Sequence, residues 1–94
     1  MTPDEIISAV AEATGVPVGA ITGKRRTGGV VTAKTMATAL LREAFPWWSL
    51  PDLAKMMGRR THGNVMHHLK RHRDMMETDS SYRKLFIGLI VSCE

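Results

Sequence analysis

Apolar residues recur at every third or fourth position through most of the chain, and in no segment of strand length do they alternate singly with polar residues. This spacing places side chains on one face of an α-helix, whereas a half-buried strand needs a period of two. The first apolar set comprises Ile6, Ile7, Val10 and Ala13, and Gly15 follows it as a helix-ending residue. The pattern therefore predicts an all-α protein.

Helix-start signals divide the chain further. A capping residue, a proline in the first turn and an acid three positions after the cap occur together at 2–5 and again at 49–52. This combination satisfies backbone N–H groups that have no partner inside the helix. We expect five main helices, with room for a short sixth at 17–21. The main helices are expected at 2–14, 32–45, 49–57, 61–76 and from 80 onward.

The length of 94 residues suits a single domain spanning 1–94, since no repeat or linker divides it. A domain of this size buries about two-thirds of the surface of its unfolded chain, which leaves no second core. Cys93 is the only cysteine, so no internal disulfide forms, and the cytoplasm is the expected compartment. We expect no membrane association, because no signal-peptide pattern and no run of ~20 apolar residues is present.

Two of the expected helices have apolar stripes that we assign to the core. The helix within 61–76 is expected to bury Val65, Met66, Leu69 and Met76. The last helix is expected to bury Tyr82, Leu85, Phe86, Leu89 and Ile90. Trp47 and Trp48 occupy the turn before the helix at 49–57, and we expect one in the core and one at the surface.

Basic residues concentrate in two windows, 24–34 and 55–73, and neither window contains an acid. The two windows hold ten of the 13 lysines and arginines, so the net charge of +4 understates the local positive charge. Glycines flank the first cluster and predict that 24–29 is a loop or arm. This distribution favours a polyanionic partner, with solvated helical faces as the alternative.

The segments 49–57 and 61–76 have the outline of a helix-turn-helix. A helix of about two turns, a tight turn containing Gly58 and a longer basic helix follow one another. In this motif the second helix enters the major groove of DNA with its N-terminus first. The residues presented to base edges would be Thr61, His62, Gly63 and Asn64. An asparagine can pair with adenine through two hydrogen bonds, and a threonine can contact a thymine methyl group.

Several stretches of the chain form a series that is specific in its order. They are Asp4-Glu5-Ile6 with Val10-Ala11, Lys24-Arg25-Arg26, Met36-Ala37 with Leu40 and Arg42-Glu43, Ser49-Leu50-Pro51-Asp52, and Gly58-Arg59-Arg60-Thr61-His62-Gly63-Asn64-Val65-Met66-His67. Together they resemble the C-terminal DNA-binding domain of the bacterial replication initiator DnaA, a helical domain with an embedded helix-turn-helix. The ATPase module of the full initiator has no counterpart in these 94 residues.

The resemblance implies roles for individual residues. Arg26 would read a minor groove, and Arg60 and His62 fall on signature positions of the recognition helix. With the helix-turn-helix interpretation, base reading is assigned to Arg26, Arg60, Thr61, His62, Gly63 and Asn64. Contacts to the DNA backbone are assigned to Lys24, Arg25, Lys34, Ser49, Leu50, Pro51, Arg59, Lys70 and Arg71. The expected partner is double-stranded DNA, bound in replication-origin recognition or regulation.

The chain departs from the family pattern at several of these positions. The family has glycine at Arg59, an acid at Thr61, and threonines at Gly63 and Asn64. The serine- and arginine-rich stretch that follows the basic run is reduced to Thr27-Gly28-Gly29, and the turn with both tryptophans has one extra residue. The fold is expected to carry over, while the recognised DNA sequence can differ.

Other chemistry is weakly supported, and no catalytic, metal or cofactor site is expected. His68 and His72 have the spacing of a zinc-binding pair, but no acid or cysteine nearby supplies a third ligand. Five cations between 59 and 73 also oppose a divalent ion. A phosphate loop ending in Gly23-Lys24 would need glycine in place of Val18. The chain is therefore expected to be a binding domain rather than an enzyme.

Two alternative functions remain open. A protein-interaction module would use the Trp47-Trp48 turn, with the basic surface incidental, and it would show no salt-dependent DNA binding. A single-stranded nucleic-acid binder needs aromatic rings for stacking on bases. It is disfavoured because neither basic window contains Phe, Tyr or Trp.

Overall fold

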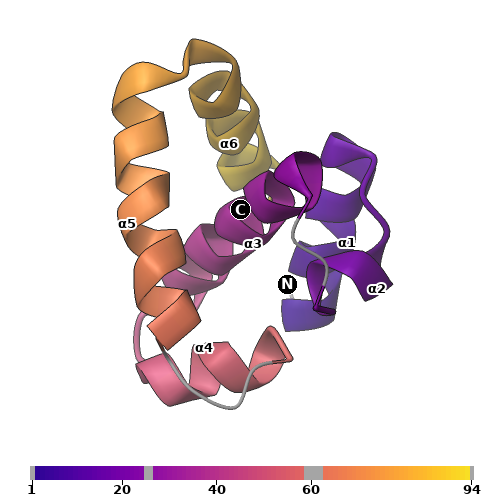
Figure 1. The fold of residues 1–94 in the computed structure, drawn as a ribbon, viewed down its shortest axis with the longest axis vertical. Coiled ribbons are helices and arrows are strands. Elements are labelled where there is room, and N and C mark those ends of the chain that lie inside the picture. Colours follow the sequence, from indigo (N-terminus) through magenta and orange to yellow (C-terminus); the bar gives the residue numbers. More distant parts are fainter. Residues whose placement is uncertain (1, 25–26, 59–62, 94) are drawn as a thin grey trace.

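The computed structural model describes residues 2–24, 27–58 and 63–93. Within them the chain forms helices only, which confirms the predicted all-α class. The helices are α1 (Pro3–Thr14), α2 (Val18–Ile21), α3 (Gly28–Ala44), α4 (Leu50–Met56), α5 (Gly63–Thr78) and α6 (Ser80–Cys93) (Figure 1). None of these helices combines the length and hydropathy needed to cross a bilayer, as far as the described residues go.

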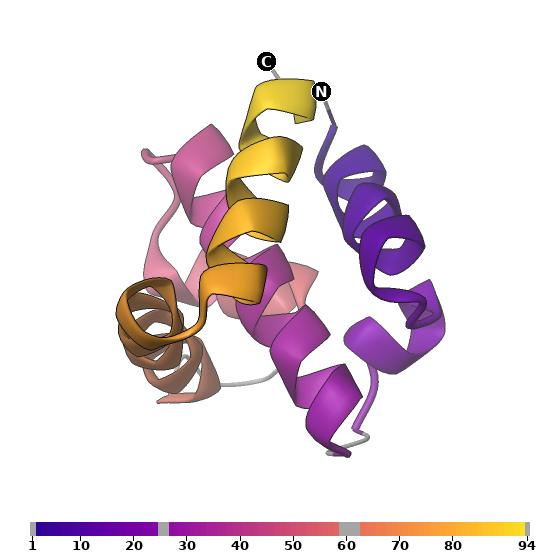
Figure 2. The same ribbon diagram turned by 90° about the horizontal axis from the view of Figure 1, so that it is seen from above.

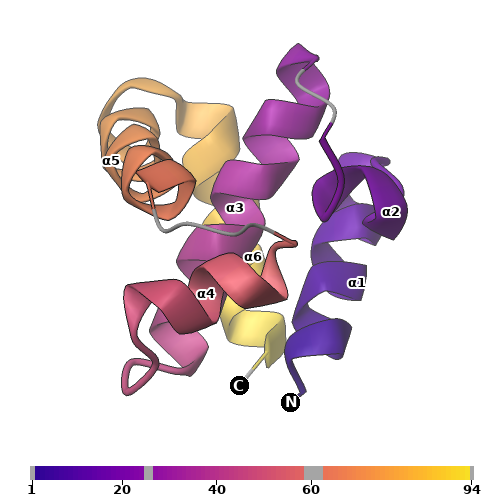
Figure 3. The ribbon, with the colours of Figure 1, turned by 60° about the horizontal axis from the view of Figure 1, so that its bottom comes forward.

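Helix α3 is the centre of the fold, and every residue from 33 to 41 is buried. Helices α1 and α2 cover one side of α3 and α5 covers the opposite side, with α6 beside it (Figure 2). Helix α4 lies across one end, next to the N-terminus of α5 (Figure 3). A helix surrounded in this way has no solvent-facing stripe along its middle, so residues of every type there must find partners inside the protein.

Both predicted helix starts are confirmed. The Thr2 hydroxyl accepts a hydrogen bond from the Glu5 backbone N–H, and the Glu5 carboxylate accepts one from the Thr2 backbone N–H. Ser49 and Asp52 form the same reciprocal pair at 3.3 Å and 3.0 Å. The hydrogen bonds from the capping residues hold the pKa of the Glu5 and Asp52 carboxyls below their usual values. These caps fix where α1 and α4 begin.

Helix α3 begins four residues earlier than expected. We predicted a loop or arm through Gly29 and a helix from Thr32, but Gly28 and Gly29 form the first helical turn. The first N–H groups of a helix need no intrahelical partner, so glycine weakens a helix less there than in its interior. The Thr32 hydroxyl also donates to the Gly28 carbonyl at 3.1 Å. The first basic window is therefore mostly helical where the structure describes it.

The prediction of burial is wrong for two residues. Met66 is 54% exposed and Leu85 is 38% exposed, whereas Val65, Tyr82, Phe86 and Leu89 are buried as predicted. Met66 follows Val65 directly and is turned about 100° away from it on the helix. Leu85 lies at the edge of a narrower stripe on α6. The neighbouring helices determine which edge of an apolar stripe is covered. The spacing of apolar residues along one helix does not show where those neighbours pack.

The two tryptophans divide as expected, with Trp47 exposed at 74% and Trp48 half-buried. Trp48 stacks on Phe45 with ring centroids 4.5 Å apart, and Trp47 meets the same ring edge-on at 5.6 Å. The Arg42 guanidinium donates to the Trp48 carbonyl at 3.0 Å. These ring contacts and the hydrogen bond from Arg42 therefore stabilise the turn between α3 and α4.

Candidate nucleic-acid interface

Helix α4, the turn that follows it and helix α5 form the predicted helix-turn-helix. Helix α4 ends with Met57 as its C-cap, and Gly58 has a φ of 73°, in the left-handed region that suits glycine. A Cβ added to Gly58 would collide with the backbone carbonyl of Thr22. Glycine is thus required twice at this position, for its φ and for close approach of another segment. The contact anchors the start of the turn against the end of α2.

The same contact brings the two basic windows together. Thr22 lies two residues before Lys24, and Gly58 lies three residues after Lys55. Both lysines are exposed. Cations that are about 30 residues apart in the chain therefore belong to adjacent parts of the surface. This adjacency favours one continuous basic surface instead of two separate ones.

Lys34 differs from its expected place. We assigned it to the DNA backbone, but its side chain is only 2% exposed and its ammonium donates to the Gly23 carbonyl at 2.6 Å. The position lies in the enclosed middle of α3, where the other helices exclude solvent. A contact with phosphate would require this side chain to leave the core. Lys34 instead holds the segment that leads into the first basic run.

The outward face of α5 is polar and basic at its N-terminal half. Its exposed residues on this face are Gly63, Met66, His67, Lys70 and Arg71. The first acid along the helix is Asp74. Met66 and His67 were not among the predicted site residues. Helical spacing from Gly63 would have identified them, since residues three and four positions apart share a face, but the assignment of Met66 to the core concealed this.

The inward face of α5 combines one buried apolar residue with two histidines. Val65 is buried, and His68 and His72 follow it as half-buried residues. His68 Nδ1 is hydrogen-bonded to the Thr35 hydroxyl at 2.9 Å, and His72 Nδ1 to the Tyr82 hydroxyl at 2.7 Å. Different helices supply the two hydroxyls, and the described residues contain no cluster of three potential metal ligands.

Burial determines the titration of this second pair. It lowers the pKa of His72 below its ordinary value, with Glu43 opposing the effect. Burial also raises the pKa of Tyr82, with Arg71 opposing. His72 is therefore neutral and Tyr82 protonated at neutral pH. His72 adds no positive charge to the basic surface under those conditions.

The remaining described candidates lie near these elements. Asn64 is half-buried at the start of α5, one residue beyond exposed Gly63. At the start of α4, Ser49 and Pro51 are exposed and Leu50 is half-buried against the core. The Ser49 hydroxyl is already engaged in the cap of α4. Only its second lone pair and its proton are available for a further contact.

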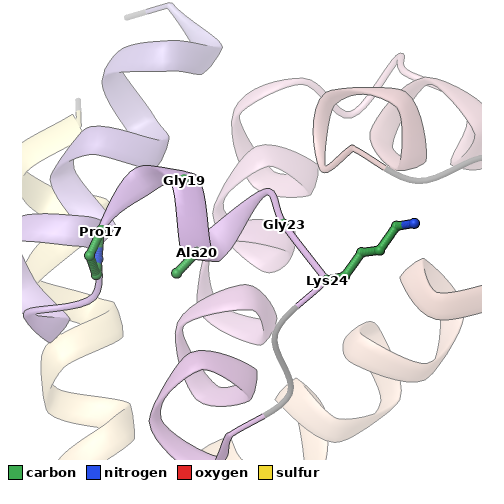
Figure 4. Close-up of a pocket in the computed structure, with 5 residues that line it drawn as sticks. All are labelled: Pro17, Gly19, Ala20, Gly23 and Lys24. Carbon is green, nitrogen blue, oxygen red and sulfur yellow. The ribbon is translucent and has the colours of Figure 1, made fainter.

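A shallow hollow of about 330 Å³ lies beside the first basic window, lined by Pro17, Gly19, Ala20, Gly23 and Lys24. The Lys24 side chain points away from Pro17 and Ala20 (Figure 4). A Cβ at Gly23 would lie 2.6 Å from the Gly19 carbonyl oxygen, so the two glycines serve a tight backbone turn. Lys24 is directed outward, as a backbone-contacting cation needs to be.

Six predicted site residues lie outside the described residues, and their roles remain predictions. They are Arg25, Arg26, Arg59, Arg60, Thr61 and His62. They belong to the two chain segments whose flanks are joined by the contact between Gly58 and Thr22.

Comparison with known proteins agrees with this geometry. The family model described as the bacterial dnaA protein helix-turn-helix matches residues 3–71. The chromosomal replication initiator protein DnaA of Aliarcobacter butzleri is 29% identical over 85 residues, which is 90% of this chain and 19% of that protein. The proteins of the same name from two strains of Thermus thermophilus are 31% identical over 91 residues, covering 97% of this chain and 21% of theirs.

The chain thus spans about a fifth of the length of the curated relatives it matches. The family match includes α1 to α4 and the first half of α5, and so contains the part of the helix-turn-helix that runs from the start of α4 to Arg71. The chain belongs to the family of bacterial DnaA helix-turn-helix domains.

Proposed function

We propose that this chain binds double-stranded DNA, with α5 in the major groove and the first basic window beside it. The observation that carries the proposal is the outward face of α5, where two cations follow an uncharged N-terminal end and no acid precedes Asp74. A recognition helix needs this arrangement, because its first turns meet base edges while later residues meet phosphates.

Contacts with the DNA backbone are proposed for the exposed cations and for the start of α4. The described residues in this set are Lys24, Ser49, Leu50, Pro51, Lys55, Lys70 and Arg71, and Arg25 and Arg59 complete it. Lysine and arginine at such positions neutralise phosphates and release counterions, which makes binding salt-dependent. Lys34 is left out because its ammonium is held inside the protein.

Base reading is proposed for the beginning of α5 and for Arg26. The set predicted from sequence is Arg26, Arg60, Thr61, His62, Gly63 and Asn64, and the exposure of Met66 and His67 supports adding both. An exposed methionine offers an apolar contact for a thymine methyl group, and Gly63 permits close approach of the helix backbone. Arg26 is proposed to enter an adjacent minor groove, where narrow A·T-rich sequence attracts a cation.

The biological setting that we propose is recognition or regulation of replication-origin sites. The support is the name of the relatives, chromosomal replication initiator protein DnaA. The N-terminal end of α5 is the end that we propose reads bases, and we call it the reading end. The chain departs from the family pattern at or beside it in four positions, which are Arg59, Thr61, Gly63 and Asn64. We therefore expect its preferred DNA sequence to differ from that of the relatives.

Selection from a random duplex library tests the proposal directly. We expect an enriched motif, and we expect log K for that motif to fall with log salt with a slope of roughly −5, for about six phosphate contacts. Failure to enrich any motif would contradict specific binding. A slope near zero would contradict the basic surface as the site.

The exposure of Trp47 supports a second candidate, a protein-interaction role for the turn between α3 and α4. A rigid, exposed tryptophan is a common anchor in interfaces. This role separates cleanly from DNA binding, because Trp47→Ala removes the anchor and leaves the charges unchanged. Retained DNA affinity in that variant, together with loss of a protein partner, would assign the two functions to different surfaces.

A further inference from the structure

The inward side of α5 holds the helix to the protein with little apolar burial. Val65 is the only residue of α5 that is fully buried. Leu69, Met75 and Met76 are partly buried against the core. Apolar contact is not directional, so a helix held by so few buried side chains can roll about its axis at small cost in buried area. The orientation of α5 must therefore depend on other contacts.

Two hydrogen bonds can set the orientation of α5. His68 and His72 are one helical turn apart, about 6 Å along the axis. Their Nδ1 atoms are joined to the hydroxyls of Thr35 on α3 and Tyr82 on α6, at 2.9 Å and 2.7 Å. Both hydroxyl-bearing residues are buried, with 0% and 4% of their surface exposed. Hydrogen bonds weaken steeply when distance or angle changes, so two of them at different heights fix both roll and tilt.

Aromatic packing further restricts the position of the His72 ring beside Tyr82. The His72 ring lies 4.3 Å from the Phe86 ring, centroid to centroid, and 5.6 Å from the Tyr82 ring. The Tyr82 backbone N–H donates to the Asp79 carboxylate at 3.0 Å, which holds the start of α6 in place. The hydroxyl that meets His72 therefore belongs to a buried residue in the capped first turn of α6.

The histidines are also in register with the reading end. Asn64, His68 and His72 follow one another at intervals of four residues, so they lie along one slowly turning ridge of α5. A roll of the helix that breaks the two hydrogen bonds also moves Asn64 and turns Gly63 and Met66 relative to the rest of the protein. Contacts in a groove tolerate little displacement, because a base-specific hydrogen bond has the same geometric limits as any other.

We propose that His68 and His72 are positioning residues for DNA recognition, which set the roll of α5 through Thr35 and Tyr82. The inference rests on the proposed function, since it concerns how the reading end of α5 is held. It adds a role for four residues that do not themselves contact DNA. Their effect is on discrimination between sequences, because removing a hydroxyl leaves every cation of α5 present, and a flexible lysine or arginine side chain can still reach a phosphate after a small roll that breaks a base-specific hydrogen bond.

Two shape-conserving substitutions test the proposal. Thr35→Val and Tyr82→Phe each delete one hydroxyl and change no charge. We expect the affinity for the selected motif to fall roughly 3- to 10-fold in each variant, while affinity for random duplex and the salt slope stay the same. Thr35→Ser retains the hydroxyl and should restore discrimination. Thr38→Val is the matched control, because the Thr38 hydroxyl is equally buried on α3 but donates to the Lys34 carbonyl.

An NMR measurement on the free protein keeps this test independent of DNA binding. Residual dipolar couplings of the α5 amides, fitted with those of α1 and α3, report the orientation of α5. We expect a reorientation of α5 in Thr35→Val and Tyr82→Phe and none in Thr38→Val. If Thr35→Val does not fold, Tyr82→Phe decides the outcome, because it keeps the buried ring.

The outcomes separate the inference from the proposed function. If the wild-type protein enriches no motif but α5 reorients in the variants, specific recognition fails while the positioning of α5 by the hydroxyls stands. If α5 keeps its orientation and discrimination is unchanged in both variants, the positioning role is overturned. Equal losses on selected and random duplex would also overturn it, since they would indicate a general loss of structure.

Discussion

The two basic windows look alike in sequence and differ in structure. In the first, Lys34 is enclosed in α3, the helix that α1, α2, α4, α5 and α6 all contact. In the second, Lys70 and Arg71 lie on the outward face of α5, which forms one side of the protein. A lysine can thus serve as an internal hydrogen-bond donor in a central helix and as a surface charge in a peripheral one. The position of the helix decides which role is taken.

The largest effect is expected from a substitution that breaks the contact between Gly58 and Thr22. Gly58→Ala places a Cβ against the Thr22 carbonyl and forces alanine into a left-handed conformation. We expect the free energy of unfolding to fall by about 3 kcal/mol, from backbone strain together with overpacking. Urea denaturation measures it. Gly63→Ala is the control, because a Cβ there meets nothing within 4 Å, and equal losses in both variants would contradict the account.

The next effect tests the internal role of Lys34. Lys34→Met keeps the length of the side chain but leaves the Gly23 carbonyl without its donor, so we expect a loss of about 2 kcal/mol in unfolding free energy. The salt slope of DNA binding should be unchanged. Lys70→Met should show the opposite pattern, with normal stability and a smaller slope. A reduced slope in Lys34→Met would return Lys34 to the DNA-contacting set.

A smaller effect sharpens the role of the second window. Arg71→Ala removes one exposed cation from α5, so binding to all duplexes should weaken by about the same factor. The salt slope should change by about one unit. Titrations at several salt concentrations, with the selected motif and with random duplex, measure both quantities. A loss confined to the selected motif would show that Arg71 reads bases instead of contacting phosphate.

The smallest effect concerns charge within the second window. Because burial lowers the pKa of His72, the folded state favours the neutral ring. The resulting stabilisation is present above the ordinary histidine pKa of about 6.5 and is lost as pH falls through the lower, folded-state value. We expect Tm to fall between pH 7 and pH 5 in the wild-type protein and to fall less in His72→Gln. Identical pH profiles would contradict the burial of a neutral His72.

Local signals predicted much of this fold. The caps at Thr2 and Ser49 and the helix-ending role of Gly58 act over a few residues, so local sequence is enough to predict them. The burial of Lys34 and the exposure of Met66 depend on which helices pack around α3 and α5. The hydrogen bonds of His68 and His72 with Thr35 and Tyr82 likewise join residues on different helices, and spacing along α5 suggested only a zinc pair.

The contact between Gly58 and Thr22 limits which grafts and which changes in loop length this domain can tolerate. The motif within 49–76 does not stand alone, because Gly58 lies directly against the backbone of Thr22, the residue that follows α2. A graft of the motif, or a length change between Ile21 and Gly28, would be transmitted to the reading end of α5. Met66 and His67 are exposed and take no part in that contact. The proposed sequence preference can therefore change through substitutions on this exposed face, while the contact between Gly58 and Thr22 is kept.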